Sequence, residues 1–285
     1  MQDRVKITLL LAPALLLIVV LFFGSIGVAL LRSFSYMPTT GLTDLNLDAY
    51  HSLLTSPVVY RSFGLSLYIA ATATGIATIL GLATALLLRR QFRGRGIASF
   101  LVHLNLTIPH LVGALGILYL LSQSGSFARL SYGMDLIDKP ADFPALIFDR
   151  YAIGIIVTYV WKELPFITLI ILANLQTLDD DHEAVARTLG ASKWQAFRYV
   201  LLPQILPGVL SASSIVFAFT FGAYEIPALL GASSPQTLPV MAYRSFTNVD
   251  LASRPQAMAL AILIGAVSAI MIAVYTRALL VKRHN

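Results

Sequence analysis

Six long apolar segments limit what this 285-residue chain can fold into. Each has about 18 or more mostly apolar residues, enough to cross a hydrocarbon core of about 30 Å. Composition agrees, because 57% of the residues are hydrophobic and only 12% are charged, about half the charged share of soluble domains. The sequence therefore predicts an all-α polytopic membrane protein that forms a single transmembrane domain over 1–285. The expected spans are 7–31, 63–88, 97–121, 151–175, 208–230 and 257–281.

The first apolar segment follows Arg4 and Lys6, as a signal peptide would. Its apolar stretch is longer than a signal-peptide core, and no clear Ala-x-Ala cleavage site follows it. We therefore expect a retained first helix. After it, the stretch 46–54 could form a short surface helix in an outer loop.

Basic residues are distributed unequally between the two sides of the membrane. With six spans, both termini share one side with the second and fourth connections, and that side holds twelve Lys and Arg residues against seven opposite. Four of the twelve lie in a short loop beside helix ends: Arg89, Arg90, Arg93 and Arg95. The positive-inside rule therefore predicts cytoplasmic termini. Asp3, Arg93 and Asn285 should be inside, and Asp48, Asp142 and Thr247 outside.

Several chemistries are excluded by missing residues. The chain has no cysteine, which rules out disulfides, zinc–thiolate sites and cysteine nucleophiles. It contains no Walker-type phosphate loop, so it cannot hydrolyse ATP by that route alone. No basic cluster interleaved with aromatics suggests a nucleic-acid partner. We expect no catalytic residue, no metal site and no cofactor in this chain.

The segment 177–205 is the one long polar interruption of the apolar sequence. Asp179, Asp180 and Asp181 suit a helix N-terminus, and Glu183 and Arg187 fall four residues apart on one helical face. Gly190 is expected to end this first helix in the left-handed conformation.

A second short helix is expected over 192–201, with Trp194, Phe197 and Leu201 on one stripe. Pro203 and Pro207 should break it before the fifth span. Two short helices at an angle could fill a groove on a protein partner. Alternatively, they could lie in the headgroup region with Trp194 as an interfacial anchor. The pattern itself leaves both interpretations open.

This segment resembles the conserved cytoplasmic loop of the permease subunits of type I binding-protein-dependent ATP-binding-cassette (ABC) importers. The family pattern is Glu-Ala-Ala, three residues, Gly, nine residues, Ile, one residue and Leu-Pro. Gly190, Val200, Leu202 and Pro203 reproduce its second half, with Val200 in place of the Ile. In the first half, 184–186 reads Ala-Val-Ala and Glu183 lies one residue early, a rotation of about 100° on a helix. A salt bridge from Glu183 to an ATPase is therefore left open.

The resemblance extends over about 45–280, including the outer stretch 45–54, the fourth-helix stretch 161–166 and the fifth-helix stretch 221–231. The last looks most like the polyamine-type branch, which also includes thiamine, ferric-ion and aminophosphonate carriers. The resemblance implies a first helix plus a five-helix core in the bacterial inner membrane. It also implies a second permease, usually a different chain, two ATPase subunits that bind ATP and Mg²⁺, and an external solute-binding protein. The implied ATPase-docking residues are Glu183, Ala184, Val185, Ala186, Arg187, Gly190, Trp194, Val200, Leu202 and Pro203.

Charged residues inside spans are costly and mark function by default. Lys162 and Glu163 fall near the middle of the fourth span, just before Pro165, which frees the carbonyl of Trp161. Glu225 falls late in the fifth span, where Pro227 should kink the helix. The candidate solute pathway comprises Asn105, His110, Trp161, Lys162, Glu163, Tyr224 and Glu225.

Two alternatives remain open for these residues. Lys162 could be a structural partner of Glu163 or Glu225, and His110 a hydrogen-bonded packing residue. A different class of protein, a secondary transporter or channel, would use Lys162, Glu163 and Glu225 for ion coupling or conduction. If they line a pathway instead, carboxylates and aromatic rings suit a cationic solute.

Overall fold

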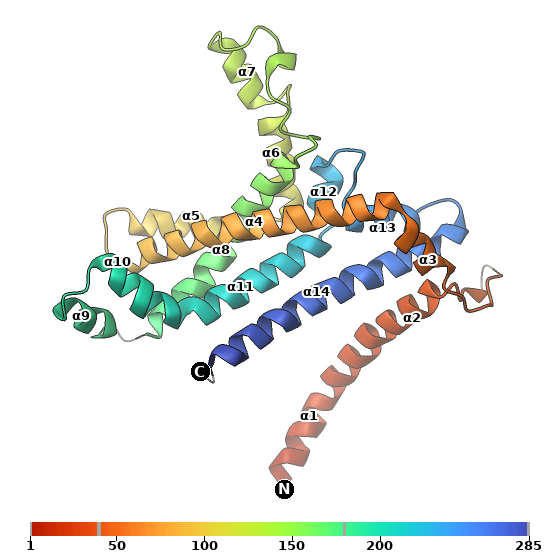
Figure 1. Ribbon diagram of the computed structural model, residues 1–285, viewed down its shortest axis with the longest axis horizontal. Coiled ribbons are helices and arrows are strands. Elements are labelled where there is room, and N and C mark those ends of the chain that lie inside the picture. The colour runs from red at the N-terminus through yellow and green to blue at the C-terminus, as the bar shows by residue number, and fades with distance from the viewer. Residues whose placement is uncertain (1, 39–40, 179–180, 284–285) are drawn as a thin grey trace. The chain divides into compact units, whose positions relative to one another are not determined.

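The computed structural model describes residues 2–38, 41–178 and 181–283 (Figure 1). Over these residues the elements are helical, and the one β contact is an isolated antiparallel bridge between Met37 and Leu42. Six helical segments are long and apolar enough to cross a membrane, which confirms the predicted class. Their bounds are Lys6–Ser33, Pro57–Arg89, His110–Gly133, Ile153–Gln176, Lys193–Gly222 and Leu251–Tyr275.

The chain divides into two compact units. The first comprises Met1–Tyr60 and Leu238–Ala266, and the second comprises Arg61–Thr237 and Val267–Asn285. α4 (Pro57–Arg89) and α14 (Arg254–Arg283) each contribute residues to both units.

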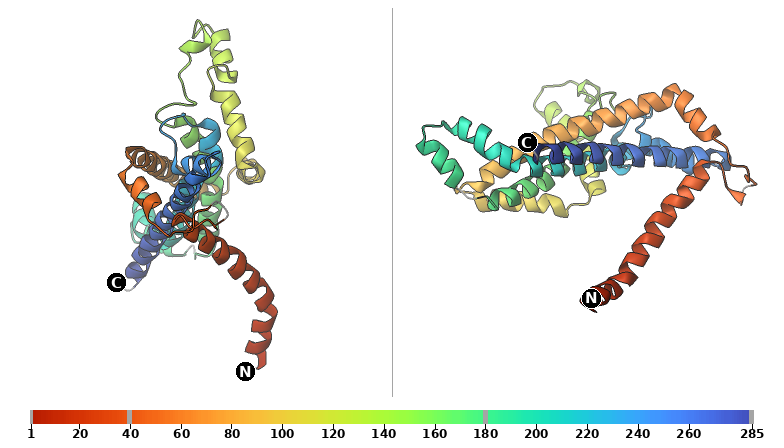
Figure 2. Two further views of the ribbon diagram at one scale, coloured as in Figure 1. Left: turned by 90° about the vertical axis from the view of Figure 1, so that its right-hand side faces the viewer. Right: turned by 60° about the horizontal axis from the view of Figure 1, so that its bottom comes forward.

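The first unit begins with one unbroken helical rod, the red ribbon of Figures 1 and 2. It consists of α1 (Gln2–Ile18), the π-helical η1 (Val19–Phe23) and α2 (Gly24–Ser33). No residue in the most apolar window of this span is buried, as expected for side chains that face lipid.

A short surface helix follows the first span, as predicted. This is α3 (Asp48–Thr55), and its Tyr50 hydroxyl lies 2.7 Å from Ser33 Oγ of α2. The same unit holds α13 (Leu238–Phe246), η5 (Leu251–Ser253) and the start of α14, whose Gln256 Nε2 donates to Ser52 Oγ over 3.2 Å.

The second unit is built around α8 (Ile153–Gln176), which packs along α11 (Leu202–Gly222) and against the residues of α4. Small residues bring the helices close, as is common between membrane helices. A Cβ atom on Gly81 of α4 would lie 2.8 Å from Ile167 Cγ2, and one on Gly208 of α11 would lie 2.6 Å from Asn174 Cγ.

The third predicted span, 97–121, is not one helix. It divides into α5 (Arg95–Thr107) and α6 (His110–Leu121), with Ile108 extended at φ −77° and ψ 122°. Pro109 is the cause, because a residue that precedes proline is disfavoured in the α conformation. α6 is followed by α7 (Ser126–Gly133) and η3 (Pro140–Asp142).

The expected breaks before the fifth span are also wrong. α10 (Lys193–Gln195) runs through the π-helical η4 (Ala196–Leu201) into α11 as one continuous helix. Pro203 is the second residue of α11, directly after the π-helical turn, where the regular α-helical hydrogen-bond pattern is already altered. Pro207 lies inside α11 without ending it.

The end of the fifth span was predicted eight residues too late. α11 ends at Gly222, Ala223 is extended, and a separate helix α12 (Glu225–Leu230) follows. Pro227 belongs to α12, so the kink expected inside a span is a break between two helices.

Candidate functional site

The polar loop after α8 begins with α9 (Asp181–Thr188). The prediction for Gly190 is confirmed, because its φ is +91°. Gly190 N–H donates to Arg187 O over 3.1 Å, and Ala191 N–H donates to Ala186 O over 3.0 Å, which closes the C-terminus of α9. Of the capping residues expected for this helix, Asp179 and Asp180 lie outside the described residues.

The second loop helix starts with a capping box. Gln195 N–H donates to Ser192 Oγ over 3.2 Å, and Ser192 N–H donates to Gln195 Oε1 over 2.8 Å. These two hydrogen bonds satisfy backbone N–H groups at the start of the helix. The predicted stripe is present: the rings of Trp194 and Phe197 lie 5.5 Å apart. Leu201 is buried beneath them, whereas Trp194 is 67% exposed.

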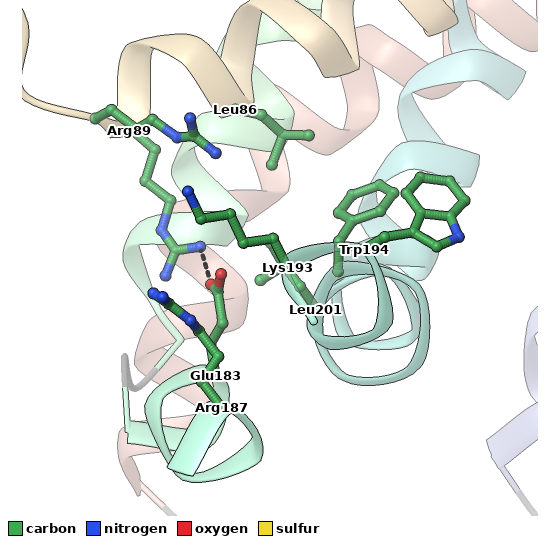
Figure 3. Close-up of a pocket in the computed structure, with 9 residues that line it drawn as sticks. Leu86, Arg89, Glu183, Arg187, Lys193, Trp194 and Leu201 are labelled. Atoms are coloured by element: carbon green, nitrogen blue, oxygen red, sulfur yellow. Dashed lines mark hydrogen bonds and ion pairs between the residues drawn. The ribbon is translucent and has the colours of Figure 1, made fainter. Parts of the chain in front are cut away.

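An ion pair ties this loop to the end of α4. Glu183 Oε2 accepts from Arg89 Nη1 over 2.9 Å (Figure 3). From the sequence, Arg187 is the expected neighbour of Glu183, and Arg89 is a signal only of membrane orientation. The signal that was missed is the basic end of α4, which lies 94 positions earlier in the chain and is brought to α9 only by folding.

The opposite face of α9 is apolar and open. Val185 is 55% exposed and Leu189 is 83% exposed. With Ala186, Tyr199 and Pro203 they line a groove of about 640 Å³ between α9 and the start of α11. Since residues 183 and 185 lie about 200° apart on a helix, α9 presents one charged face to α4 and one apolar face outward.

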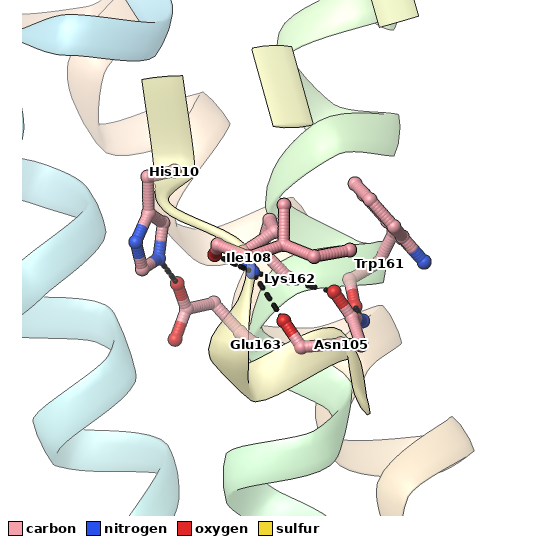
Figure 4. A network of polar contacts seen from close by, with 6 residues as sticks. All are labelled: Asn105, Ile108, His110, Trp161, Lys162 and Glu163. Atoms are coloured by element: carbon pink, nitrogen blue, oxygen red, sulfur yellow. Dashed lines mark hydrogen bonds and ion pairs between the residues drawn. The ribbon is translucent and has the colours of Figure 1, made fainter. Parts of the chain in front are cut away.

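The buried charge of Lys162 is satisfied by the main chain of the broken third span (Figure 4). Its Nζ donates to Asn105 O over 2.6 Å, to Ile108 O over 2.7 Å and to Asn105 Oδ1 over 3.3 Å. All three ammonium protons are thus directed to oxygen atoms at the junction of α5 and α6. Among the described residues no carboxylate forms an ion pair with Lys162. The alternative in which Lys162 is the ion-pair partner of Glu163 or Glu225 is therefore not what the structure displays.

The Trp161 carbonyl, which Pro165 leaves without its usual helical N–H donor, has another hydrogen-bond partner, as a carbonyl inside a membrane protein requires. Asn105 Nδ2 donates to Trp161 O over 2.6 Å. Asn105 therefore joins α5 to α8 twice, once through this amide group and once through Lys162. Both contacts are consistent with a helix-packing role for Asn105 and Lys162 rather than direct contact with a solute.

Glu163 is paired with the first residue of α6. His110 Nε2 lies 3.0 Å from Glu163 Oε1, and the His110 side chain is 35% exposed whereas that of Glu163 is 9% exposed. The His110 ring also lies 5.1 Å from the ring of Phe219 in α11. His110 is thus hydrogen-bonded, as anticipated, and still partly accessible.

Tyr224 and Glu225 do not lie in the fifth span. Tyr224 precedes the first turn of α12 and Glu225 occupies it, and both side chains are exposed. Glu225 therefore lies beyond the end of the fifth span, and among the described ion pairs it is joined neither to Lys162 nor to Glu163. No group of three His, Cys, Asp or Glu side chains suited to a metal occurs within the described part of the chain.

Over the described residues, six helices long and apolar enough to span a membrane and a helical loop between the fourth and the fifth of them define a multi-pass membrane protein. Residues 77–283 match the family described as binding-protein-dependent transport system inner membrane component. The chain belongs to this family, the inner-membrane permease subunits of ABC importers.

The names of its relatives refer to different solutes. The chain is 30% identical over 229 residues to the molybdenum transport system permease protein ModB of Mycobacterium tuberculosis, with 78% of this chain and 81% of ModB covered. It is 30% identical over 217 residues to the putrescine transport system permease protein PotI of Escherichia coli, with 75% and 70% covered.

Two crystal structures of a bacterial alginate ABC transporter share the fold, and one of them is in complex with an alginate pentasaccharide-bound periplasmic protein. Both superpose with a TM-score of 0.79, at 18% and 17% identity. The matches cover 97% and 96% of this chain, and 95% and 93% of the transporter chains.

Proposed function

We propose that this permease forms the solute path of an importer whose energy comes from separate subunits. Its assembly would contain a second permease, two ATPase subunits and an external binding protein that delivers the solute. Family membership supports this composition, and so does the alginate transporter complex with its periplasmic protein. ATP and Mg²⁺ would be bound in the ATPase subunits, and this chain would perform no covalent chemistry.

The apolar face of α9 is the ATPase-docking surface in this proposal. The observation that carries it is the 83% exposure of Leu189 next to exposed Val185, because a large apolar side chain outside the membrane favours burial against a protein partner. Glu183 points to α4 instead. A salt bridge from Glu183 to the ATPase is therefore not part of the proposal.

Two structural links would carry ATPase movement into the membrane. The Arg89–Glu183 ion pair connects α9 to α4, and the continuous helix from Lys193 to Gly222 connects the loop to the fifth span. Closure of the ATPases would move the loop inward, and these links would rotate the spans so that solute access alternates between the two sides.

The docking assignment is tested with Leu189→Asp in the complete complex. A charge at this position should abolish co-purification of the ATPase subunits while membrane insertion of the permease is retained. Thr188→Asp is the matched control, because Thr188 is also exposed but lies about 100° away around α9. If the ATPase subunits still co-purify with Leu189→Asp, or if both variants lose them equally, the apolar face of α9 is not the docking surface.

The solute is proposed to be a small polar molecule, with a polyamine-like cation favoured and thiamine, ferric ion or aminophosphonate as further candidates. The support is the exposed carboxylate of Glu225 beside the exposed ring of Tyr224, because carboxylates and aromatic faces attract cations. The relative named for putrescine agrees, whereas the one named for molybdenum does not. His110 and Phe219 supply a second accessible stretch of the path.

Glu225→Gln tests this part of the proposal by measuring putrescine uptake in cells or proteoliposomes. The change removes charge but keeps size, so uptake should fall steeply while assembly and thermal stability hardly change. Unchanged uptake of a solute that the complex demonstrably transports would reject the pathway role of Glu225.

A further inference from the structure

A second cavity lies on the charged side of α9, away from the proposed ATPase-docking face. It has a volume of about 580 Å³ and is enclosed by the end of α4, by α9 and by the start of the α10–η4 helix. Figure 3 shows Arg89, Arg187 and Lys193 extending toward one another from these elements, with Leu86 and Trp194 beside them.

The charges around this cavity are unbalanced. Of the described residues that line it, four are cationic, namely Arg89, Arg90, Arg187 and Lys193, and one, Glu183, carries a carboxylate. Glu183 is already engaged by Arg89 at 2.9 Å. Among the described ion pairs, Arg90, Arg187 and Lys193 have no carboxylate partner. Like charges held this close repel one another, so an anion in the cavity would stabilise the arrangement.

The geometry of the cations suits an oxyanion. Three of them are guanidinium groups, whose forked donors match the oxygens of a phosphate group. They also come from two separate parts of the chain, α4 and the α9–α10 loop. An anion between them would therefore hold the loop to the end of a membrane span.

The remaining wall of the cavity is apolar. It is formed by Leu86, Phe197 and Leu201, with the Trp194 ring 5.5 Å from that of Phe197. The cavity is lined by Arg89 and Arg90 at the end of the spanning helix α4. Basic residues and tryptophan are both enriched where membrane spans meet the headgroup region. A free phosphate ion would make no favourable contact with an apolar wall, whereas a phospholipid would place its glycerol and upper acyl chains against it.

We propose that this cavity binds the phosphodiester headgroup of an anionic phospholipid, such as phosphatidylglycerol. The bound headgroup bridges Arg90 of α4 to Arg187 and Lys193 of the loop, in parallel with the Arg89–Glu183 pair. Lipid composition then tunes how tightly the docking loop is fastened to the membrane domain.

The test uses the full-length chain in nanodiscs and Trp194 as the reporter. The chain has two tryptophans, so Trp161→Phe leaves Trp194 as the sole fluorophore and keeps the main-chain carbonyl at position 161. Acyl-brominated phosphatidylglycerol and acyl-brominated phosphatidylcholine are titrated separately as quenchers. Phosphatidylglycerol should quench Trp194 at a clearly lower mole fraction.

The cavity is then tested by paired substitutions in the Trp161→Phe background. Arg90→Gln with Arg187→Gln should reduce the preference for phosphatidylglycerol by about tenfold, because each basic residue near the surface contributes to anionic-lipid binding. Arg93→Gln with Arg198→Gln is the control, since both residues are exposed in the same two loops but lie outside the cavity lining. The control pair should retain the preference.

Three results would overturn the proposal. Equal quenching by the two lipids in the Trp161→Phe protein would show that no anionic-lipid site exists, and this result does not depend on the folding of the cavity variants. Equal loss in the two pairs of substitutions would show general surface attraction only. Displacement of phosphatidylglycerol by millimolar inorganic phosphate, with a matching change in Trp194 emission in phosphatidylcholine discs, would identify a soluble phosphate as the ligand.

Discussion

Arg89 and Glu183 lie 94 positions apart in the chain and form an ion pair of 2.9 Å. Arg89 is the last residue of α4, and Glu183 is in the first turn of α9. The pair therefore joins the end of a membrane span to the loop that we assign to the ATPase. Its two side chains are 24% and 34% exposed, so solvent screens the pair and its contribution to stability is small.

The first prediction concerns this pair. Glu183→Gln should change stability by less than about 1 kcal/mol, because solvent screens a partly exposed pair. It should nevertheless raise the number of ATP molecules hydrolysed for each solute transported, since α9 would move without drawing α4 along. The measurement is uptake and ATP hydrolysis in the same proteoliposomes.

A charge exchange distinguishes the pair from either residue acting alone. Arg89→Glu combined with Glu183→Arg keeps the net charge and restores opposite partners, so coupling should recover in part. Coupling as poor in the exchange as in Glu183→Gln would contradict the assignment to the pair.

The second prediction concerns Lys162 and the broken third span. Lys162→Met leaves Asn105 O and Ile108 O without their charged donor, which should cost on the order of 1–3 kcal/mol. Thermal unfolding in detergent should show the loss. Trp161→Phe is a suitable neighbouring control, because the carbonyl that accepts from Asn105 is retained.

Glu225→Gln should not rescue Lys162→Met, since Glu225 is exposed on α12 and lies outside the contacts of Lys162. Rescue by that second change would show that the two residues are partners after all.

The third prediction compares two glycines of α4. Gly81→Ala places a Cβ atom 2.8 Å from Ile167 Cγ2, and overpacking of this kind typically costs about 1–3 kcal/mol. Gly75→Ala meets nothing within 4 Å and should stabilise the helix by about 0.5–1 kcal/mol. Opposite shifts in melting temperature are expected. If the two shifts have the same sign, the α4–α8 packing described above is wrong.

The fourth prediction is the membrane orientation. Because the chain has no cysteine, single cysteines can be introduced at Arg93 on one side and at Asp48, Asp142 and Thr247 on the other. A membrane-impermeant thiol reagent added outside the cell should label the last three only. The terminal positions Asp3 and Asn285 should behave like Arg93. Labelling of position 93 from outside would reverse the proposed topology.

The class and the approximate spans could be predicted from the sequence, because a helix that crosses a membrane needs a continuous run of apolar residues long enough to span the hydrocarbon core. The fourth span shows this, with 151–175 predicted and Ile153–Gln176 found. The local signal at Gly190 was also sufficient, because this residue adopts φ +91° directly after α9.

Proline effects were predicted with mixed success because they depend on position within a helix. Pro109 divides the third span, whereas Pro203 follows a π-helical turn and Pro207 lies inside α11, and neither of these two ends the helix. The π-helical η4 immediately before α11 absorbs the local mismatch. A single sequence offers no sign of that π-helical turn.

Partners of the charged residues could not be predicted, because they come from distant segments. Lys162 binds main-chain oxygens of a helix break that the sequence analysis did not anticipate. Glu163 is paired with His110, which lies 53 positions earlier in the chain. Apolar periodicity says nothing about such contacts, which arise only when α5, α6 and α8 pack together.

The central claim is that the exposed apolar face of α9 contacts the ATPase subunit, and site-specific photo-crosslinking tests it most directly. A photoreactive amino acid at Leu189 of the intact complex should give an adduct with the mass of permease plus ATPase. The same probe at Ile97, which is 69% exposed near the start of α5, is the control and should give no such adduct. An ATPase adduct from position 97 but none from position 189 would contradict the account.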